Sequence, residues 1–279
     1  MNSLSALNAQ QKEAVTTLEG PVMILAGAGS GKTRVIIQRI AHLIQKKQVS
    51  PQQILAVTFT NKAADEMRAR LKEMLSGKQQ GMHLSTFHAL GVSLLRKSIH
   101  HLGYRQNFII YDTRDQYSVI KTIMEDHDID DSGLIDAKLV HSEISRAKSA
   151  GQSPEDFLLQ QESLQKQMVG KIFRHYQKTM KGCNVIDFDD ILNLTLTLFE
   201  NHPEVMDSLT ERFRYIMVDE YQDTNRIQYK LLQHLTKRNR NLCVVGDDDQ
   251  SIYGWRGAEV RNIFDFENDF PEVKIVRLE

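Results

Sequence analysis

The stretch ILAGAGSGKTRV, residues 24–35, joins an apolar run to a series of small residues, then to a lysine, a threonine and a helical pattern. Side chains this small leave the backbone N–H groups exposed, so that they can surround the oxygens of a phosphate. The start of the following helix directs the positive end of its dipole at the same anion. The stretch therefore predicts a nucleotide-binding phosphate loop.

The loop residues have separate expected roles. The backbone N–H groups of the loop are expected to contact the phosphates. These N–H groups belong to Ala28, Gly29, Ser30 and Gly31. Lys32 is expected to reach the β and γ phosphates, and the Thr33 hydroxyl to ligate Mg²⁺. The generic pattern begins with glycine six residues before the lysine, where this chain has Ala26. A chance turn of small residues is the alternative, but a strand and a helix flank the loop as the function requires.

Apolar runs that end in polar residues predict the rest of the fold. Six of them occur, at 21–26, 54–59, 82–87, 215–220, 242–247 and 273–278. Continuous runs of this length are typical of parallel strands that are buried on both faces. Helical spacing follows the first two runs, at 35–44 and 63–74. This alternation predicts a doubly wound α/β core. Residues 89–199 are polar and mostly helical in period, and we interpret them as an insertion between residues 1–88 and 200–279.

Two strand ends carry further candidate site residues. YIMVDEYQD, 215–223, places Asp219 to hold the metal and Glu220 to act as the base for an attacking water. A surface ion pair at the strand end is the alternative. In VVGDDDQSIYGWRGA, 244–258, the neutral amide of Gln250 suits sensing of the γ phosphate. Three more residues of this segment, Tyr253, Trp255 and Arg256, suit stacking on bases and phosphate contact, although Trp255 could also be a core residue.

The composition limits the classes of protein to consider. The 279 residues carry a formal net charge of −1, so any binding of DNA must depend on a local surface. The two cysteines, Cys183 and Cys243, lie far apart, which argues against both a disulfide framework and a zinc site. The sequence shows neither a signal-peptide pattern at its start nor a membrane-spanning apolar run. We expect a cytoplasmic protein.

Seven motifs together resemble one family. They are LNAQQKEAV, AGAGSGKTR, AVTFTNKAADEM, STFHALG, DFDDIL, VDEYQDTN and VVGDDDQSIYGWRGA, in the order found in superfamily 1A DNA helicases. The chain resembles the N-terminal half of the Rep/UvrD/PcrA group, with Rep and UvrD as the nearest in motif, and an alanine at position 26 is normal there. The resemblance implies a RecA-like P-loop NTPase sheet, called domain 1A, interrupted by the mainly helical domain 1B. It also implies 3′–5′ translocation on single-stranded DNA, driven by hydrolysis of ATP with Mg²⁺.

The same resemblance implies roles for further residues. Gln11 would read the adenine edge, and Arg34 would lie against the base. The single-strand track would be lined by Phe59, Asn61, Thr86, His88, Tyr253, Trp255 and Arg256. The acids of DFDDIL, namely Asp187, Asp189 and Asp190, could suggest a two-metal nuclease, but their position in the family favours a structural role. Gln222 and Asp223 would couple the nucleotide and DNA sites.

The chain ends at RLE, 277–279, where the family continues into an arginine-bearing motif and a second RecA-like domain. We therefore expect a piece of a longer protein that binds nucleotide weakly, hydrolyses it poorly and does not unwind DNA alone. The expected partners are single-stranded DNA, junctions of single and double strands, the second RecA-like domain, and replication or repair proteins. Two alternatives stay open at this point: a non-catalytic single-strand-binding module and the motor of a helicase–nuclease.

Overall fold

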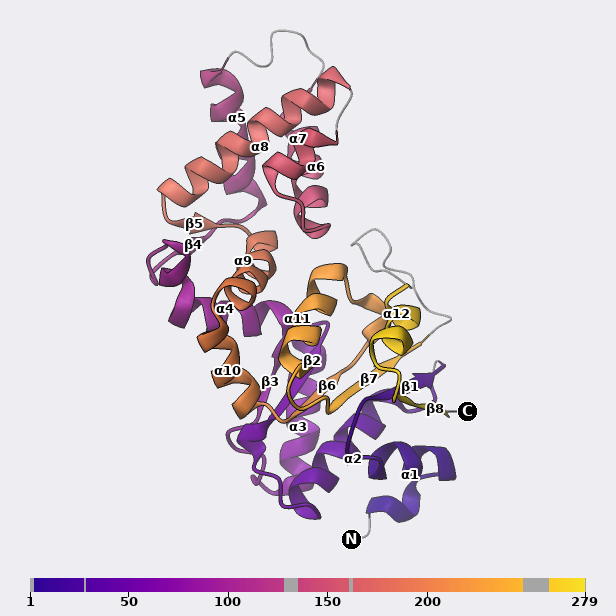
Figure 1. Cartoon of the computed structure of the whole chain (residues 1–279). Coiled ribbons are helices and arrows are strands. Elements are labelled where there is room, and N and C mark those ends of the chain that lie inside the picture. The colour runs from indigo at the N-terminus through magenta and orange to yellow at the C-terminus, as the bar shows by residue number, and fades with distance from the viewer. Residues whose placement is uncertain (1–2, 28, 128–134, 161–162, 248–260, 279) are drawn as a thin grey trace. The chain divides into compact units, whose positions relative to one another are not determined.

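The chain forms two compact units in a computed structural model that describes residues 3–27, 29–127, 135–160, 163–247 and 261–278 (Figure 1). Unit 1 contains residues 1–90 and 203–279, and unit 2 contains residues 91–202. Each unit has its own core of buried apolar side chains. Along the described residues, no helix is long and apolar enough to cross a membrane.

A six-stranded sheet, parallel throughout, forms the centre of unit 1. Its strands are β1 (Val22–Ala26), β2 (Ile54–Thr58), β3 (His83–Thr86), β6 (Tyr215–Val218), β7 (Leu242–Gly246) and β8 (Lys274–Leu278). They lie in the order β3-β2-β6-β7-β1-β8. The six strands predicted from the apolar runs are confirmed, as is the α/β fold class.

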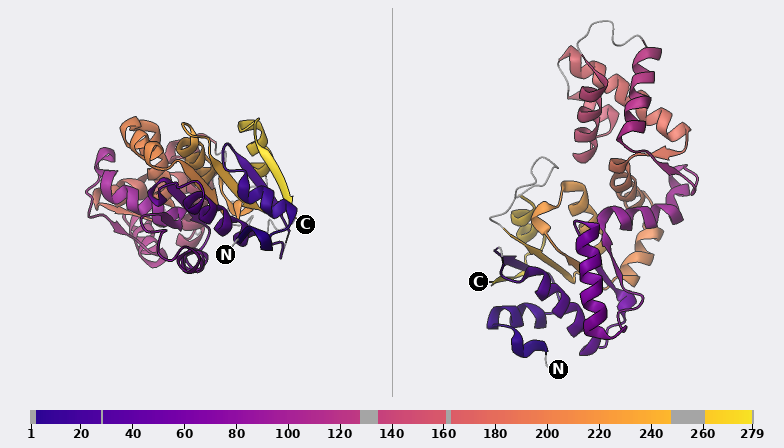
Figure 2. Two further views of the ribbon diagram at one scale, coloured as in Figure 1. Left: turned by 90° about the horizontal axis from the view of Figure 1, so that it is seen from below. Right: turned by 180° about the vertical axis from the view of Figure 1, so that it is seen from behind.

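Helices cover both faces of this sheet (Figures 1 and 2). They are α1 (Ala9–Thr16), α2 (Lys32–Gln45), α3 (Asn61–Leu75), α10 (Pro203–Arg212), α11 (Arg226–Thr236) and α12 (Arg261–Asp269), and α4 (Phe87–Ser98) begins in this unit. Short 3₁₀ turns are η1 (Ser3–Ala6), η2 (Pro51–Gln53) and η4 (Tyr221–Asp223). The β1–α2–β2 and β7–α12–β8 crossovers run in opposite directions along the sheet, so their right-handed connections place α2 and α12 on opposite faces.

Unit 2 is mainly helical. Its helices are α5 (Thr113–Asp126), α6 (Ala137–Ser149), α7 (Pro154–Leu159), α8 (Leu164–Gly182) and α9 (Phe188–Asn201), with the 3₁₀ turn η3 (Ile99–Leu102). Side-chain oxygens cap the starts of these five helices, from Asp112, Asp136, Ser153, Ser163 and Asp187. Two short parallel strands, β4 (Ile109–Ile110) and β5 (Val185–Ile186), complete the unit.

Candidate nucleotide site

The phosphate loop joins β1 to α2 at the carboxyl edge of the sheet. Gly29 and Gly31 have φ angles of 80° and 89°, a region that favours glycine. A Cβ on Gly27 or Gly29 would meet no atom within 4 Å, so the loop borders open space. Among the described residues, no side chain caps the N-terminus of α2, in contrast to α1, α3 and α11. Its first N–H groups therefore remain available to an anion.

The neighbouring strands bring the predicted acids to this loop. Because β6, β7 and β1 are adjacent, their carboxyl ends meet at one edge of the sheet. The Thr33 hydroxyl donates to Asp219 Oδ2 at 3.2 Å. Lys32 Nζ lies 3.1 Å from Asp247 Oδ2 and 3.9 Å from Glu220 Oε2. The side chains of Lys32, Thr33, Asp219 and Glu220 thus converge at this edge. Residue 28 and Gln250 lie outside the described residues.

Asp219 and Thr33 are suited to hold Mg²⁺. Neighbouring ligands of an octahedral Mg²⁺, bound at about 2.1 Å, lie about 3.0 Å apart. The two oxygens of this pair are 3.2 Å apart, so they fit one cation or its hydration shell. Burial raises the pKa of Asp219 to about 6, and the neighbouring charge of Glu220 adds to this effect. A divalent cation would offset both effects because it favours the ionised carboxylate.

Glu220 is held by its neighbours in an uncommon conformation. Its φ of 52° and ψ of 47° lie in the left-handed region, which is rare for residues other than glycine. Its backbone N–H donates to Asp219 Oδ1 at 3.0 Å, and its Oε2 accepts from Gln222 Nε2 at 2.7 Å. These contacts direct the carboxylate toward the space beside Lys32, where a nucleophilic water could be bound.

The structure adds information on two residues of the site. The sequence assigned no role to Asp247, and it did not show how Gln222 would act. Asp247 is fully buried and contacts Lys32. Gln222 was expected to couple two sites, and its amide accepts from the Asp247 N–H at 3.0 Å while donating to Glu220. Asp223 is buried in the same turn, η4. An acid directly after a buried strand was the available signal for Asp247.

Gln11 and Arg34 connect the N-terminal segment to the loop. Gln11 Nε2 donates to the carbonyl of Ser30 at 3.0 Å, and Arg34 Nη2 donates to the carbonyl of Ala6 at 3.1 Å. Gln11 also belongs to a capping box with Asn8, which fixes the start of α1. A glutamine amide offers the donor and acceptor that complement the N7 and N6 atoms of adenine. These residues can therefore form the base end of a nucleotide site.

The DNA candidates in the described part of the chain follow β2 and β3. Phe59 is half-buried and Asn61 is exposed at the start of α3. Thr86 ends β3, and its hydroxyl accepts from the Ala89 N–H at 3.2 Å. Burial lowers the pKa of His88 to about 4, so its imidazole is neutral at pH 7. All four lie at the same edge of the sheet as the phosphate loop. Tyr253, Trp255 and Arg256 lie outside the described residues.

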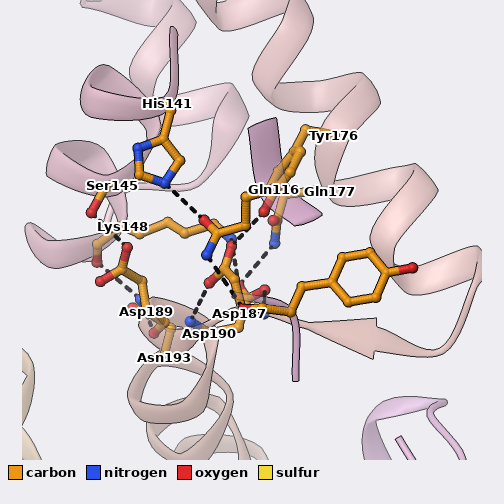
Figure 3. A network of polar contacts seen from close by, with 11 residues as sticks. Gln116, His141, Ser145, Lys148, Tyr176, Gln177, Asp187, Asp189, Asp190 and Asn193 are labelled. Atoms are coloured by element: carbon orange, nitrogen blue, oxygen red, sulfur yellow. Dashed lines mark hydrogen bonds and ion pairs between the residues drawn. The ribbon is translucent and has the colours of Figure 1, made fainter. Parts of the chain in front are cut away.

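The acids of DFDDIL surround a buried ammonium group in unit 2 (Figure 3). Lys148 Nζ contacts Asp187 and lies 2.8 Å from Asp190 Oδ1. Asp187 also accepts from the Tyr176 hydroxyl, at 3.0 Å. Asp189 accepts from the Ser145 hydroxyl at 2.7 Å, and burial raises the pKa of Asp189 to about 6. A cation from the protein thus occupies the position that a metal would need, which supports a structural role rather than a nuclease.

The fold is a RecA-like α/β domain with a mainly helical insertion, of the kind found in helicases. Residues 7–271 match the family described as UvrD/REP helicase N-terminal domain, and the chain belongs to this family. It is 46% identical to the ATP-dependent DNA helicase PcrA of Staphylococcus epidermidis strain ATCC 35984. It is 45% identical to the protein of the same name from Staphylococcus aureus strain Mu50. Each alignment covers 100% of this chain and 38% of the relative, so the chain spans little more than a third of the relatives' length.

Proposed function

We propose that this chain is the nucleotide-binding part of an ATP-dependent 3′–5′ DNA helicase, in which hydrolysis of Mg·ATP drives translocation on single-stranded DNA and separation of the duplex. The observation that carries this proposal is the convergence at one sheet edge. There Lys32 and Thr33 of α2 meet Asp219 and Glu220, which directly follow β6. Family membership and the DNA helicase activity for which the PcrA relatives are named support the DNA part of the proposal.

The residues have distinct roles in the proposed reaction. The loop N–H groups and Lys32 bind the phosphates and stabilise their negative charge. Thr33 and Asp219 would hold Mg²⁺, which would supply positive charge to neutralise the phosphates. Glu220, oriented by Gln222, accepts a proton from the attacking water. Gln11 and Arg34 bind the adenine end, and Gln250 senses the γ phosphate. Arginines of a second RecA-like domain would complete the site, because an arginine finger accelerates hydrolysis by about 10³–10⁵.

The DNA path is proposed along the carboxyl ends of β2 and β3. Phe59 offers a ring for base stacking, and Asn61, Thr86 and His88 offer polar contacts. Tyr253, Trp255 and Arg256 would extend this path. Because the chain has a net charge of −1, stacking and local contacts must supply most of the attraction. Junctions of single and double strands, and replication or repair proteins, are the proposed partners of the longer protein.

Titration calorimetry of Mg·ATP into the chain and into its Lys32→Ala variant tests the proposal. We expect binding that weakens at least tenfold in the variant, because the lysine charge at the phosphates is lost. A short single strand should strengthen binding in the parent chain if the two sites are coupled. Equal affinity of parent and variant would contradict the phosphate loop. Binding of DNA without any binding of nucleotide would favour a non-catalytic single-strand-binding module.

A further inference from the structure

Arg39 is a buried cation on α2 without a carboxylate partner. Its side chain is 2% exposed. Among the described residues no carboxylate lies within 4.0 Å of its guanidinium, and its Nε is buried without a hydrogen-bond partner. Burial of a charge is costly unless the charge is compensated. A methionine would fill similar space without this cost, so the contacts of the guanidinium must account for the charge.

The guanidinium contacts the end of α1. Arg39 Nη1 donates to the carbonyl of Ala14 at 2.6 Å. The bond from the Thr17 N–H to the Glu13 carbonyl closes the last turn of α1, so the Ala14 carbonyl lies among those left over at the helix end. A cation at this end also interacts favourably with the helix dipole. Because α1 has only eight residues, its position depends on such contacts rather than on its own stability.

The other end of α1 carries the glutamine of the proposed base site. Gln11 Oε1 accepts from the Asn8 N–H at 3.3 Å, and Gln11 Nε2 donates to the Ser30 carbonyl at 3.0 Å. An amide has two N–H donors and two lone pairs on its oxygen, so these bonds leave one donor and one acceptor. That pair complements the N7 and N6 atoms of adenine. The placement of the amide follows the placement of α1.

We propose that Arg39 is a positioning residue for base recognition, which rests on the nucleotide-binding function proposed above. It fixes α1 against α2 and thereby sets where the Gln11 amide lies relative to the phosphate loop. The same helix, α2, starts at Lys32 and so holds the phosphate end, while its next two turns hold the base end through Arg39. Arg39 lies seven positions after Lys32, about 10 Å along the helix, and it is buried against α1, so it would act through α1 and not by direct contact.

Three ligands separate the two ends of the site in calorimetry: Mg·ATP, Mg·ITP and Mg·tripolyphosphate. Inosine lacks the amino group that would donate a hydrogen bond to a glutamine oxygen, and tripolyphosphate lacks a base. For Arg39→Met we expect about tenfold weaker binding of ATP, a smaller preference for ATP over ITP, and tripolyphosphate affinity within twofold of the parent. Arg39→Lys retains a cationic donor on a long side chain and should restore most of the loss. Equal weakening of ATP and tripolyphosphate would reduce Arg39 to a support of the fold and overturn the proposal.

A double-mutant cycle with Gln11→Ala tests whether Arg39 acts through Gln11. In the Gln11→Ala background, Arg39→Met should change the ratio of ATP to tripolyphosphate affinity less than twofold. A full tenfold loss in that background overturns the proposal. If Arg39→Met does not fold, Arg39→Lys carries the same cycle. If the parent chain binds tripolyphosphate and ATP with equal affinity, the phosphate loop binds phosphate but the base is not recognised. That result would contradict the role of Arg39 and leave the proposed function standing. A parent that binds neither overturns the proposed function, and the role of Arg39 with it.

Discussion

Glu220 combines a candidate catalytic role with an unfavourable backbone conformation. Its φ of 52° brings Cβ close to the following carbonyl, which costs about 1–2 kcal/mol for an L residue. The surrounding bonds hold it there, from its own N–H to Asp219 and from Gln222 to its carboxylate. Backbone strain of this size is often concentrated at functional sites, where a side chain has to be placed in one direction.

Replacement of Glu220 by glycine and by alanine separates the strain from the side chain. Both variants should lose hydrolysis, since both lack the carboxylate. The glycine variant should be more stable than the alanine variant by about 1 kcal/mol in urea denaturation, because glycine adopts positive φ without strain. Glu66, exposed on α3, provides the matched control. There the alanine variant should be more stable than the glycine variant by about 1 kcal/mol. An alanine variant at 220 as stable as the glycine variant would remove the argument for strain.

At the residue scale, the sequence predicts the candidates but not their contacts. Lys32 and Thr33 follow from the spacing of one local motif, and Asp219 and Glu220 from acids directly after an apolar run. The contact of Lys32 with Asp247 depends on β7 lying beside β1, a pairing of strands more than 200 residues apart that no local pattern encodes. The left-handed conformation of Glu220 likewise has no signal in its residue type.

At the scale of elements, α7 and α8 pack closely because residue 170 has no side chain. A Cβ on Gly170 would lie 2.4 Å from Leu158 Cδ2 and 3.3 Å from Phe157 Cδ1. Leu158 would have to move, and Phe157 is buried, so Gly170→Ala should lower the free energy of unfolding of unit 2 by about 1–3 kcal/mol. Urea denaturation followed by circular dichroism measures this change.

Gly182, at the end of the same helix, is the control for this prediction. A Cβ there would meet no atom within 4 Å. Gly182→Ala should leave stability unchanged or raise it by up to about 1 kcal/mol, because alanine restricts the unfolded chain. Leu158→Ala should rescue part of the loss in Gly170→Ala. Equal effects of the two glycine replacements would show that close packing at Gly170 is unimportant.

The buried acids between α6 and α9 give unit 2 a defined pH dependence. Burial and the charge of Asp187 raise the pKa of Asp189 to about 6, from 3.8. Because the pKa of Asp189 is higher in the folded than in the unfolded state, its protonation stabilises the folded state. This contribution is fully present below pH 3.8 and is lost as the pH rises through 6. Asp189→Asn should abolish this fall, so that at pH 7 the variant is more stable than the parent by about 1–3 kcal/mol.

Urea denaturation of unit 2 at pH 4.5 and pH 7 measures the difference for Asp189→Asn. Asp112 serves as the control, because it titrates below this pH range and Asp112→Asn should leave the difference between pH 4.5 and pH 7 unchanged. Hydrogen bonds from the backbone of α5 lower the pKa of Asp112, so its contribution is present above pH 3.8 and is lost as the pH falls. An Asp189→Asn variant less stable than the parent at pH 7 would contradict the raised pKa.

The strands of the sheet are the elements that the sequence predicts best. Each apolar run became a strand because burial on both faces requires the same continuous pattern. The stretch FIIYD, 108–112, is also apolar, but its apolar residues are not all buried. Ile109, in β4, is 60% exposed. Phe188 is 56% exposed at the start of α9, and the sequence did not single it out. Apolar composition predicts burial only where periodicity or length adds to it.

At the scale of the whole molecule, each unit has its own cluster of buried apolar side chains among the described residues. The cluster in unit 1 contains buried apolar residues of α1, α2, α3 and the large sheet. The core of unit 2 is formed by residues of α5, α6, α7, α8 and β5. No residue belongs to both clusters within the described part of the chain. The sequence predicts an insertion here from the change in period near residue 89, whereas the separation of the cores depends on side-chain packing.

Two cores predict that Mg·ATP stabilises unit 1 alone. A ligand that binds only the folded state adds about 2.7 kcal/mol of stability at a concentration 100 times its Kd. Hydrogen exchange should therefore slow by about 100-fold in the slowest amides of β1, β6 and β7, while those of α8 change little. Lys148→Met should speed exchange in α8, because it leaves the carboxylates of Asp187 and Asp190 buried without their cation, and should not affect β1. Equal protection of α8 and β1 by Mg·ATP would instead mean that the two cores unfold as one cooperative unit, through the continuous helix α4 that begins in one and ends in the other.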